Sequence, residues 1–326
     1  MSLSDYATAS NYLIAAATVV LALAALAYVA QWGFARTLAP ERETVSLPHS
    51  LRSREVPPGS TTGTVVELVE ATESAERSDV AGGIGLSLTA LAWLLLLLGV
   101  ASRGMAAERV PWGNMYEFGC AAILMVLTAY LVLVKVWSID WVGPMVTGFG
   151  TIVLGASMLV YVPAGPLVPA LHSYWLVIHV LGAMISGAAF LVGAAASVLY
   201  LVKSKAEATT PDDERTGFLW RIPPSAKIDQ VAYRVHAFAF PIWTFAALIA
   251  GPIWAQYAWG RYWGWDPKEV WAFITWVVYA GYLHARATAG WKGKAAAILA
   301  LVGFATFVFN FTGVNLFVGG MHSYAK

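Results

Sequence analysis

Hydrophobic residues run along this chain in long blocks, and charged residues gather between the blocks. No Asp, Glu, Lys or Arg occurs from Trp141 to Val202, or from Ala295 to Ala325. A helix that crosses the hydrocarbon core of a bilayer needs about 20 mainly apolar residues, so these blocks predict membrane-spanning helices. We expect about eight, at residues 12–34, 81–101, 115–136, 143–162, 173–202, 231–251, 267–288 and 295–313. The predicted fold class is therefore an all-α integral membrane protein.

The composition agrees with this prediction and narrows the classes of function. Of 326 residues, 59% are hydrophobic and 12% are charged, against about 25% charged in soluble domains. The net charge of +1 does not indicate a nucleic-acid partner, and we expect membrane lipids around the helices. The single cysteine, Cys120, lies inside a predicted span, and no CxxC or CxxCH occurs. This excludes a thiol oxidoreductase and a c-type cytochrome.

Lys and Arg favour the inner side of a membrane, and their positions orient the spans. With both termini outside, the inner loops carry 15 of the 20 Lys and Arg residues and the outer segments carry five. The first span follows the acidic Asp5, without a basic region or a clear cleavage site, so we expect a retained helix and not a signal peptide. The lack of a transit peptide and the many alanines favour a bacterial plasma membrane over a thylakoid membrane.

The spacing of the spans divides the chain into two regions. Residues 1–80 hold the first span and a polar inner loop, 35–80, which contains four prolines and mixed charges and which we expect to be flexible. Residues 81–326 hold the other seven spans and form the main membrane domain. We expect the functional site in the four short outer segments, 102–114, 163–172, 252–266 and the tail from about 314.

The outer loop before the seventh span is unusually rich in aromatic residues. It reads WGRYWGW from Trp259 to Trp265 and continues as DPKE to Glu269. Because tryptophan and tyrosine favour the headgroup level of any membrane protein, one interpretation is an interfacial belt. The other outer segments lack this enrichment, which favours a binding surface for a large planar ligand.

The DPKE segment is a sequence signature of a helix start. Asp266 is placed as the N-cap, Pro267 as the first helical residue and Glu269 as the third, which is a capping box. We therefore expect Asp266 and Glu269 to fix the boundary between loop and helix, a role that we favour over acid–base catalysis. Such a cap would hold Trp263 and Trp265 rigidly against the end of the helix.

Histidines supply candidate ligands for a metal in that planar ligand. His179 lies near the outer start of the fifth span and His322 lies in the outer tail, both on the side of the aromatic loop. Two neutral imidazoles on opposite faces of a haem make a bis-histidine site; a plain polar contact between helices is the alternative. His172, seven residues before His179, is placed on nearly the same helix face. His49, in the polar inner loop, has no expected role.

A second pair of histidines lies deeper in the predicted spans. His284 is 17 residues from Pro267, about 26 Å along its helix, and His236 lies at similar depth in the preceding span. Ionisable residues inside a membrane indicate function, with interfacial snorkelling as the alternative. If His284 binds a second haem, its companion ligand is His236 or a residue of a partner chain. At the outer surface we expect Glu117 to stabilise the start of a helix.

With these motifs the chain resembles the CcsA/ResC family of System II cytochrome c biogenesis. Some actinobacterial members of that family are called CcsB. That family belongs to a haem-handling superfamily with a tryptophan-rich WWD signature. The resemblance covers roughly residues 85–326, and its most specific motif is WGxxWxWDPKE, which fits this family better than the related CcmC proteins. The matching stretches are 114–117, 175–180, 259–271, 282–286 and 315–324.

The resemblance implies a role for each candidate residue. His179 and His322 match the outer ligands of haem iron, and His284 matches a membrane histidine at an inner haem site. The family places the companion of His284 on a ResB/Ccs1-type membrane protein. The ligand would be haem b, which is transported, and the residues expected to bind it are His179, His322, His284, Trp259, Trp263, Trp265 and Asp266.

The function that the resemblance implies is one part of a cytochrome c synthetase. Haem would move outward, settle on the tryptophan loop and be attached to an apocytochrome c, whose CxxCH thiols form thioethers. A thioredoxin-like protein would keep those thiols reduced. No residue is an obvious general base for the thiols. Three alternatives stay open: CcmC-like delivery of haem to a chaperone, a b-type electron-transfer protein, and a transporter of another flat ligand.

Overall fold

The computed structural model describes residues 2–36, 38, 62–167 and 169–322, and all regular structure in those ranges is helical. The predicted all-α fold is confirmed. Short 3₁₀ turns and two π-helical turns, η5 (Ala246–Ala250) and η6 (Phe309–Gly313), join or continue the α-helices. The α-helices are α1 (Leu3–Phe34), α2 (Thr62–Ala107), α3 (Met115–Trp137), α4 (Gly143–Leu159), α5 (Tyr174–Thr209), α6 (Phe218–Arg221), α7 (Ser225–Phe245), α8 (Gly251–Trp259), α9 (Pro267–Thr288), α10 (Lys294–Val308) and α11 (Val314–Phe317).

Seven helical segments among the described residues are long and apolar enough to cross a membrane, and they make this a multi-pass membrane protein. Three of them are composite. One joins the 3₁₀ turn η2 (Asp140–Val142) to α4, another combines α7, η5 and α8 from Ser225 to Trp259, and the third combines α10, η6 and α11 from Lys294 to Phe317. The remaining expected span, the seventh in chain order (267–288), is present as α9 with the expected bounds. Its tryptophans, tyrosines and terminal charges leave α9 less apolar than the other seven segments.

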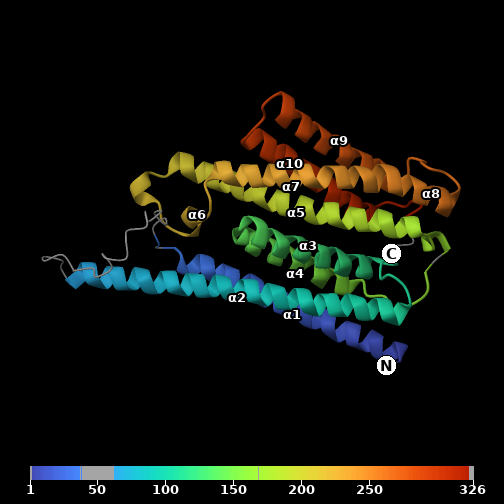
Figure 1. Ribbon diagram of the computed structural model, residues 1–326, viewed down its shortest axis with the longest axis horizontal. Helices are drawn as coiled ribbons and strands as arrows, with labels where there is room; N and C mark the ends of the chain where they lie inside the picture. The colour runs from blue at the N-terminus through green and yellow to red at the C-terminus, as the bar shows by residue number, and fades with distance from the viewer. Residues whose placement is uncertain (1, 37, 39–61, 168, 323–326) are drawn as a thin grey trace.

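The arrangement in space nevertheless gives α9 the place of an eighth pass. In Figure 1 the marks for the two chain ends lie at one end of the molecule, the end that also holds α8, and α6 lies at the opposite end. The α9 helix leads away from α8, and α10, which packs against α9, returns. Counting α9 as a pass gives an even number, which agrees with both chain ends lying at one end of the molecule in Figure 1.

The second helix is longer than the sequence pattern predicts. The segment 35–80 was expected to be a flexible loop, but α2 begins at Thr62 and continues without a break to Ala107. The physical reason is that the four prolines of that segment end at Pro58, and the residues that follow favour a helix, including an ion pair one turn apart between Glu73 and Arg77. The prolines and His49 lie outside the described residues. The regional boundary at residue 80 stays a prediction.

The α5 helix is the centre of the bundle, because α3, α7, α8 and α10 all pack against it. Small residues make this close approach feasible, as in other membrane helices. A Cβ atom at Gly187 would lie 2.4 Å from the ring of Phe307, and one at Gly182 would lie 2.9 Å from the Cβ of Ala246. The α1 helix packs along α2 and α4 on the other side of the bundle.

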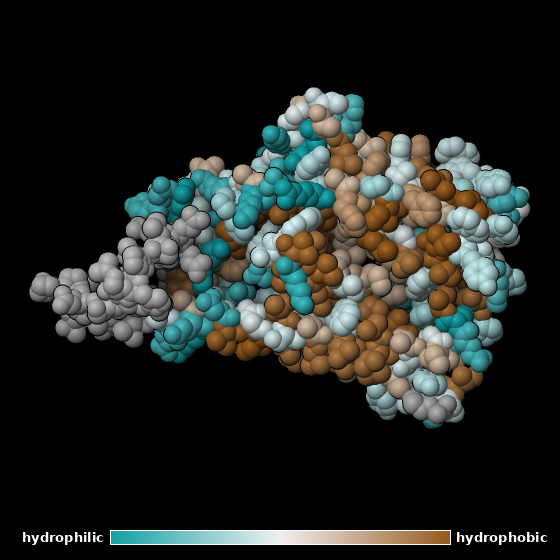
Figure 2. Space-filling view, viewed as in Figure 1, coloured by the Kyte–Doolittle hydropathy of each residue, from teal (hydrophilic) through white to brown (hydrophobic). Residues whose placement is uncertain are grey.

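The outer surface of the bundle is apolar where lipid would cover it. Figure 2 shows hydrophobic residues over much of the middle of the visible face and hydrophilic residues at the end that carries α6. Side chains such as Ile152 and Leu159 are 71% and 88% exposed, and large exposed apolar areas mark contact with lipid or protein. Inside, the hydroxyls of Thr147 and Ser197 donate to carbonyls one turn earlier, so they need no water.

A buried ion cluster joins the helices at the end that holds α8. The Glu117 carboxylate, fully buried at the start of α3, accepts hydrogen bonds from Arg103 Nε at 2.9 Å and Arg109 Nη1 at 2.8 Å. It also accepts from the Gly113 N–H at 2.8 Å. The predicted position at a helix start is confirmed, and the two arginines are the part that the sequence pattern missed. The cluster ties α2 to α3 without exposed charge.

We expect the substitution Glu117→Ala to lower the free energy of unfolding strongly, by about 3–5 kcal/mol, because it leaves the buried Arg103 charge without its partner. Glu73→Ala removes an exposed pair and serves as the control, with an expected effect of about 0.3–0.5 kcal/mol. Heating the protein in detergent and following maleimide labelling of the buried Cys120 measures the unfolding midpoint. Equal midpoints for the two variants would show that the cluster does not stabilise the bundle.

Candidate functional site

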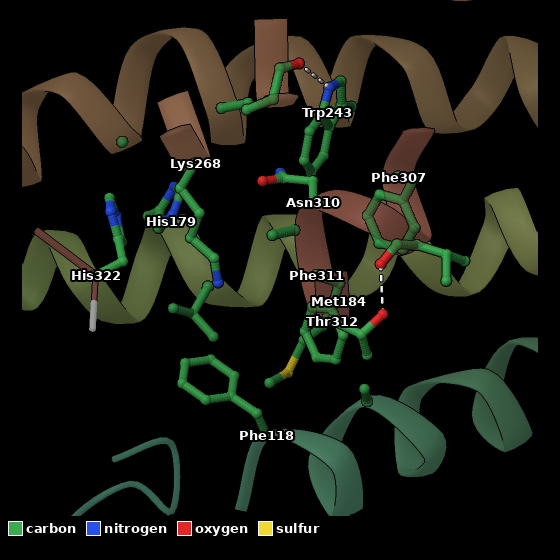
Figure 3. A pocket seen from close by; sticks show the side chains of 18 of the residues that line it. Phe118, His179, Met184, Trp243, Lys268, Phe307, Asn310, Phe311, Thr312 and His322 are labelled. Atoms are coloured by element: carbon green, nitrogen blue, oxygen red, sulfur yellow. Dashed lines mark hydrogen bonds between the residues drawn. The ribbon is translucent and has the colours of Figure 1, made fainter. Parts of the chain in front are cut away.

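The helices of the second half of the chain enclose a cavity at the end that holds α8. Its volume is about 300 Å³, at the lower end of the range for small-molecule sites. The wall is mostly apolar and includes parts of α3, α5, α8, η5, η6 and the start of α9. Figure 3 shows His179, His322 and Lys268 on one side and Trp243, Phe307 and Asn310 on the other. A few polar groups in an apolar wall are typical of a ligand site.

A π-helical turn orients His179. Pro252 has no N–H, and its ring would clash with the carbonyl of residue 248 in a regular α-helix. The backbone changes register in η5, just before this proline, where the Gly251 N–H donates to the Ala246 carbonyl; such turns are frequent at functional sites. The Nδ1 of His179 donates to the same carbonyl at 2.8 Å. Nε2 is therefore the ring atom that carries the lone pair.

Asp266 orients the second histidine of the site. Its carboxylate accepts a hydrogen bond from His322 Nδ1 at 2.7 Å, one from the Met321 N–H at 2.6 Å and one from the Lys268 N–H at 3.2 Å. Glu269 accepts from the Asp266 N–H at 3.0 Å, which completes the capping box. The capping prediction is confirmed. The structure adds that the capping residue also holds the C-terminal tail.

The protonation states of this pair suit a metal ligand. Burial lowers the pKa of His322, and the hydrogen bond with Asp266 offsets only part of that effect. Burial by itself would raise the pKa of Asp266, but hydrogen bonds from His322 and Met321 outweigh it and lower that pKa to about 2. At neutral pH Asp266 is therefore ionised and His322 is neutral with its proton on Nδ1. A neutral imidazole is the form that binds a metal.

Two tryptophans hold the imidazoles from the side. Trp254 is 2% exposed and stacks on His179, with ring centroids 5.9 Å apart and planes inclined by 9°. The same indole lies 5.6 Å from the ring of His322, so it contacts both histidines. Trp259, the last residue of α8, lies edge-on to His322 at 4.8 Å. The two imidazoles therefore both lie against one indole, although their residues are 143 positions apart in the sequence.

The other two tryptophans of the loop differ in exposure. Trp263 lines the cavity, and its Nε1 is buried with no hydrogen-bond partner among the described residues. Trp265 is 66% exposed and lies edge to face with Trp263 at 5.8 Å. Its φ of +57° is an uncommon backbone conformation for a bulky residue and costs about 1–3 kcal/mol. The structure thus brings Trp259 and Trp263 to the cavity and leaves Trp265 at the surface.

Four cavity residues have roles that the sequence motifs do not indicate. Trp254 forms the wall behind both histidines, and Phe118 faces them from α3. Lys268 extends from the first turn of α9 into the cavity, although the capping motif gives it no role of its own. Asn310 is buried in η6 with its Oδ1 unpartnered among the described residues. In the sequence, only the presence of a polar side chain inside the charge-free block 295–325 could have indicated a role for Asn310.

The remaining histidines lie away from the cavity. The expected shared helix face of His172 and His179 is wrong, because Ser173 caps α5 and leaves His172 in the preceding loop. His284 is exposed on α9. His236 is fully buried and packs against Tyr279 and other aromatic rings. The structure therefore does not bring His236 and His284 together, and His49 lies outside the described residues.

The donor set of the cavity fits the iron of a tetrapyrrole better than a bare ion. Among the residues that the structure describes, no group of three or more His, Cys, Asp or Glu side chains could hold a metal ion. His179 and His322 supply two imidazoles whose Nδ1 atoms are engaged by acceptors, the usual arrangement around metal-binding histidines. A haem brings four nitrogens of its own and needs only these two ligands.

Comparison with known proteins reveals clear similarity over most of the chain. The family described as "Cytochrome C assembly protein" matches residues 86–322. A cytochrome c biogenesis protein CcsA from Synechococcus sp. (strain CC9902) is 37% identical over 272 residues, which cover 76% of this chain and 88% of that protein. CcsA from Chlamydomonas reinhardtii is 38% identical over 241 residues, 71% of this chain and 65% of that protein. CcsA from Parasynechococcus marenigrum (strain WH8102) is 35% identical over 272 residues, with coverages of 77% and 89%.

We expect the pKa of His322 to lie below the ordinary value of about 6.5, and lower still in Asp266→Asn, which lacks the carboxylate that favours the imidazolium. Because the folded-state pKa is lowered, the contribution of His322 to stability is present above about pH 6.5 and is lost as the pH falls through the folded-state pKa. NMR titration of the protein with labelled histidine measures both values. A His322 pKa at or above 6.5 would contradict the neutral-ligand assignment.

Proposed function

The chain belongs to the cytochrome C assembly protein family. We propose that it binds haem in the cavity described above and presents it for covalent attachment to an apocytochrome c. The protein acts in cytochrome c biogenesis as the CcsA-type subunit of a System II synthetase. The haem is haem b, a substrate that passes through the site. The CxxCH segment of the apocytochrome is the second substrate.

One observation carries this proposal. His179 and His322, which come from distant parts of the sequence, both hold Nδ1 against an acceptor and both contact Trp254. Their Nε2 atoms are thus the coordinating atoms, in a cavity walled by aromatic rings. This is the arrangement that a bis-histidine haem site requires.

The residues of the chain orient the haem, and the haem and the thiols supply the bonds. Each cysteine thiol adds across a vinyl group, so that a sulfur–carbon bond forms and the thiol proton goes to the other vinyl carbon. The histidine of the apocytochrome then replaces one imidazole on iron. The Asp266–His322 hydrogen bond keeps that imidazole oriented until the exchange, and the apolar wall excludes water. We assign no general base among the residues of this chain.

The exposed position of His284 supports an inner site that another chain completes. Its side chain lies on the outward face of α9, whereas His236 is buried in the bundle core. We propose that a histidine of a ResB/Ccs1-type membrane partner supplies the companion ligand. A thioredoxin-like protein that reduces the apocytochrome thiols completes the set of partners.

We place both termini and the cavity on the outer side of a bacterial plasma membrane. The inner loops carry 15 of the 20 Lys and Arg residues, as the positive-inside rule requires. Figure 1 places the two chain ends at one end of the bundle, where α8 and the cavity also lie. Haem bound there faces the compartment in which c-type cytochromes are assembled.

The absorption spectrum of the protein purified with its partner tests the haem site. His179→Ala and His322→Ala each remove one axial ligand, and we expect a weaker and shifted Soret band together with about 10-fold or greater loss of cytochrome c assembly, in line with ligand-shell substitutions. Added imidazole should restore part of the band. His284→Ala should reduce haem loading without shifting the band of the outer site.

The control for this series is His172→Ala, because His172 lies close in sequence but in the loop outside α5. It should leave the spectrum and the assembly activity unchanged. The proposed function fails if the double variant of His179 and His322 still assembles cytochrome c at the normal rate. Full haem occupancy in that variant would instead indicate a permanently bound electron-transfer haem elsewhere.

Fusions test the orientation independently. Alkaline phosphatase joined to the C-terminus should be active, because it folds only outside the plasma membrane, and the same enzyme inserted at Asp213 between α5 and α6 should be inactive. A fluorescent protein that matures only inside should give the opposite pattern. The reverse result for both fusion positions would invert the proposed topology.

A further inference from the structure

Within the described part of the chain, two hydrogen-bond donors of the cavity have no acceptor. Lys268, the second residue of α9, lines the cavity, and its ammonium has no ion pair among the described residues. Trp263 lines the same cavity, and its Nε1 is buried and unpartnered within the described part of the chain. Figure 3 shows the Lys268 side chain extending into the space next to His179. Both donors come from the segment that starts α9.

The two carboxylates nearby are already engaged. Asp266 accepts from His322, Met321 and the backbone of Lys268. Glu269 accepts from the N–H groups of Gly264 and Asp266 and from Arg261. Among the described residues, neither carboxylate forms a hydrogen bond or an ion pair with the Lys268 ammonium.

A cation at an apolar wall that forms no ion pair is stabilised when a ligand places a negative charge in direct contact with it. The start of α9 adds the positive end of a 22-residue helix dipole on the same side. Asn310, whose Oδ1 has no partner among the described residues, lies on the other side of the cavity beside Trp243. The side of the cavity formed by α9 thus offers positive charge and donors, which is what an anionic oxygen ligand needs.

We propose that Lys268 and Trp263 bind a propionate carboxylate of the haem and so fix the rotation of the ring about its axis. This inference rests on the proposed haem site and deepens it. In haem b the propionates and the vinyl groups lie on opposite edges of the ring. Holding the propionate edge at the start of α9 turns the vinyl edge away from it, toward the side where the apocytochrome thiols must arrive. Lys268 is in this sense a positioning residue.

The test compares two porphyrins on the full chain in lipid nanodiscs. Haemin and haemin dimethyl ester share the iron and the vinyl groups, but the ester lacks the negative charges. We expect the wild type to bind haemin about 10-fold or more tightly than the ester, the scale of one charge-assisted hydrogen bond. Lys268→Met should weaken haemin binding by about the same factor and leave ester binding unchanged, whereas Lys268→Arg should retain most of the preference for haemin.

Two further variants complete the design. Trp263→Phe keeps the ring and removes the donor, and it should reduce the preference for haemin by a smaller factor. Lys292→Met removes an exposed lysine beyond the far end of α9 and should change neither affinity. Soret titration reports the affinities, and the band position shows that both imidazoles still bind iron.

The outcomes separate the inference from the proposed function. If the wild type binds both porphyrins equally, or if Lys268→Met weakens both by the same factor, the propionate assignment is overturned and the haem site stands. If the wild type binds neither porphyrin, the haem site itself is overturned and this inference falls with it. A preference for haemin that disappears in Lys268→Met alone supports the assignment.

Discussion

The Asp266 carboxylate is the point on which the site depends. One group caps α9, binds the backbone of the tail at Met321 and orients the ring of His322. Because all three bonds end on two oxygens, the loop, the helix and the tail hold their positions only together. The carboxylate that fixes the start of α9 therefore also turns the His322 imidazole toward the cavity. Helix capping and the orientation of the His322 ring thus depend on the same carboxylate.

The second histidine is held by a different device with the same result. The Ala246 carbonyl accepts from the Gly251 N–H of its own helix and also from the ring of His179 on α5, because a carbonyl oxygen has two lone pairs. The η5 turn, which Pro252 favours, presents Ala246 in this way. The η6 turn places Asn310 and its neighbours in the opposite wall. Two interruptions of helical regularity therefore shape a cavity in an otherwise regular bundle.

Charge is distributed unequally between the two ends of α9. Its start carries Lys268 and two engaged carboxylates beside the cavity, and its last turn carries Arg286, which pairs with Asp229 of α7 at 2.7 Å. His284 lies one turn from that end and faces outward. The same helix thus contributes to the enclosed cavity and carries the exposed histidine for which we propose a partner ligand. Its lower hydropathy, compared with the other passes, reflects its charged and aromatic residues.

The sequence by itself determined the helical membrane fold, seven of whose passes stand out by hydropathy alone. It also determined the cap at Asp266 and the aromatic loop. These features depend on residues next to each other in the chain, as the lengths of the apolar blocks do. It misplaced His172 and the start of α2, since helix boundaries depend on caps and context. Only the tertiary structure decided that His179 and His322 both contact Trp254, that Arg103 pairs with Glu117 and that Lys268 enters the cavity. Those contacts join segments far apart in the chain, and no local pattern encodes a distance between side chains on different helices.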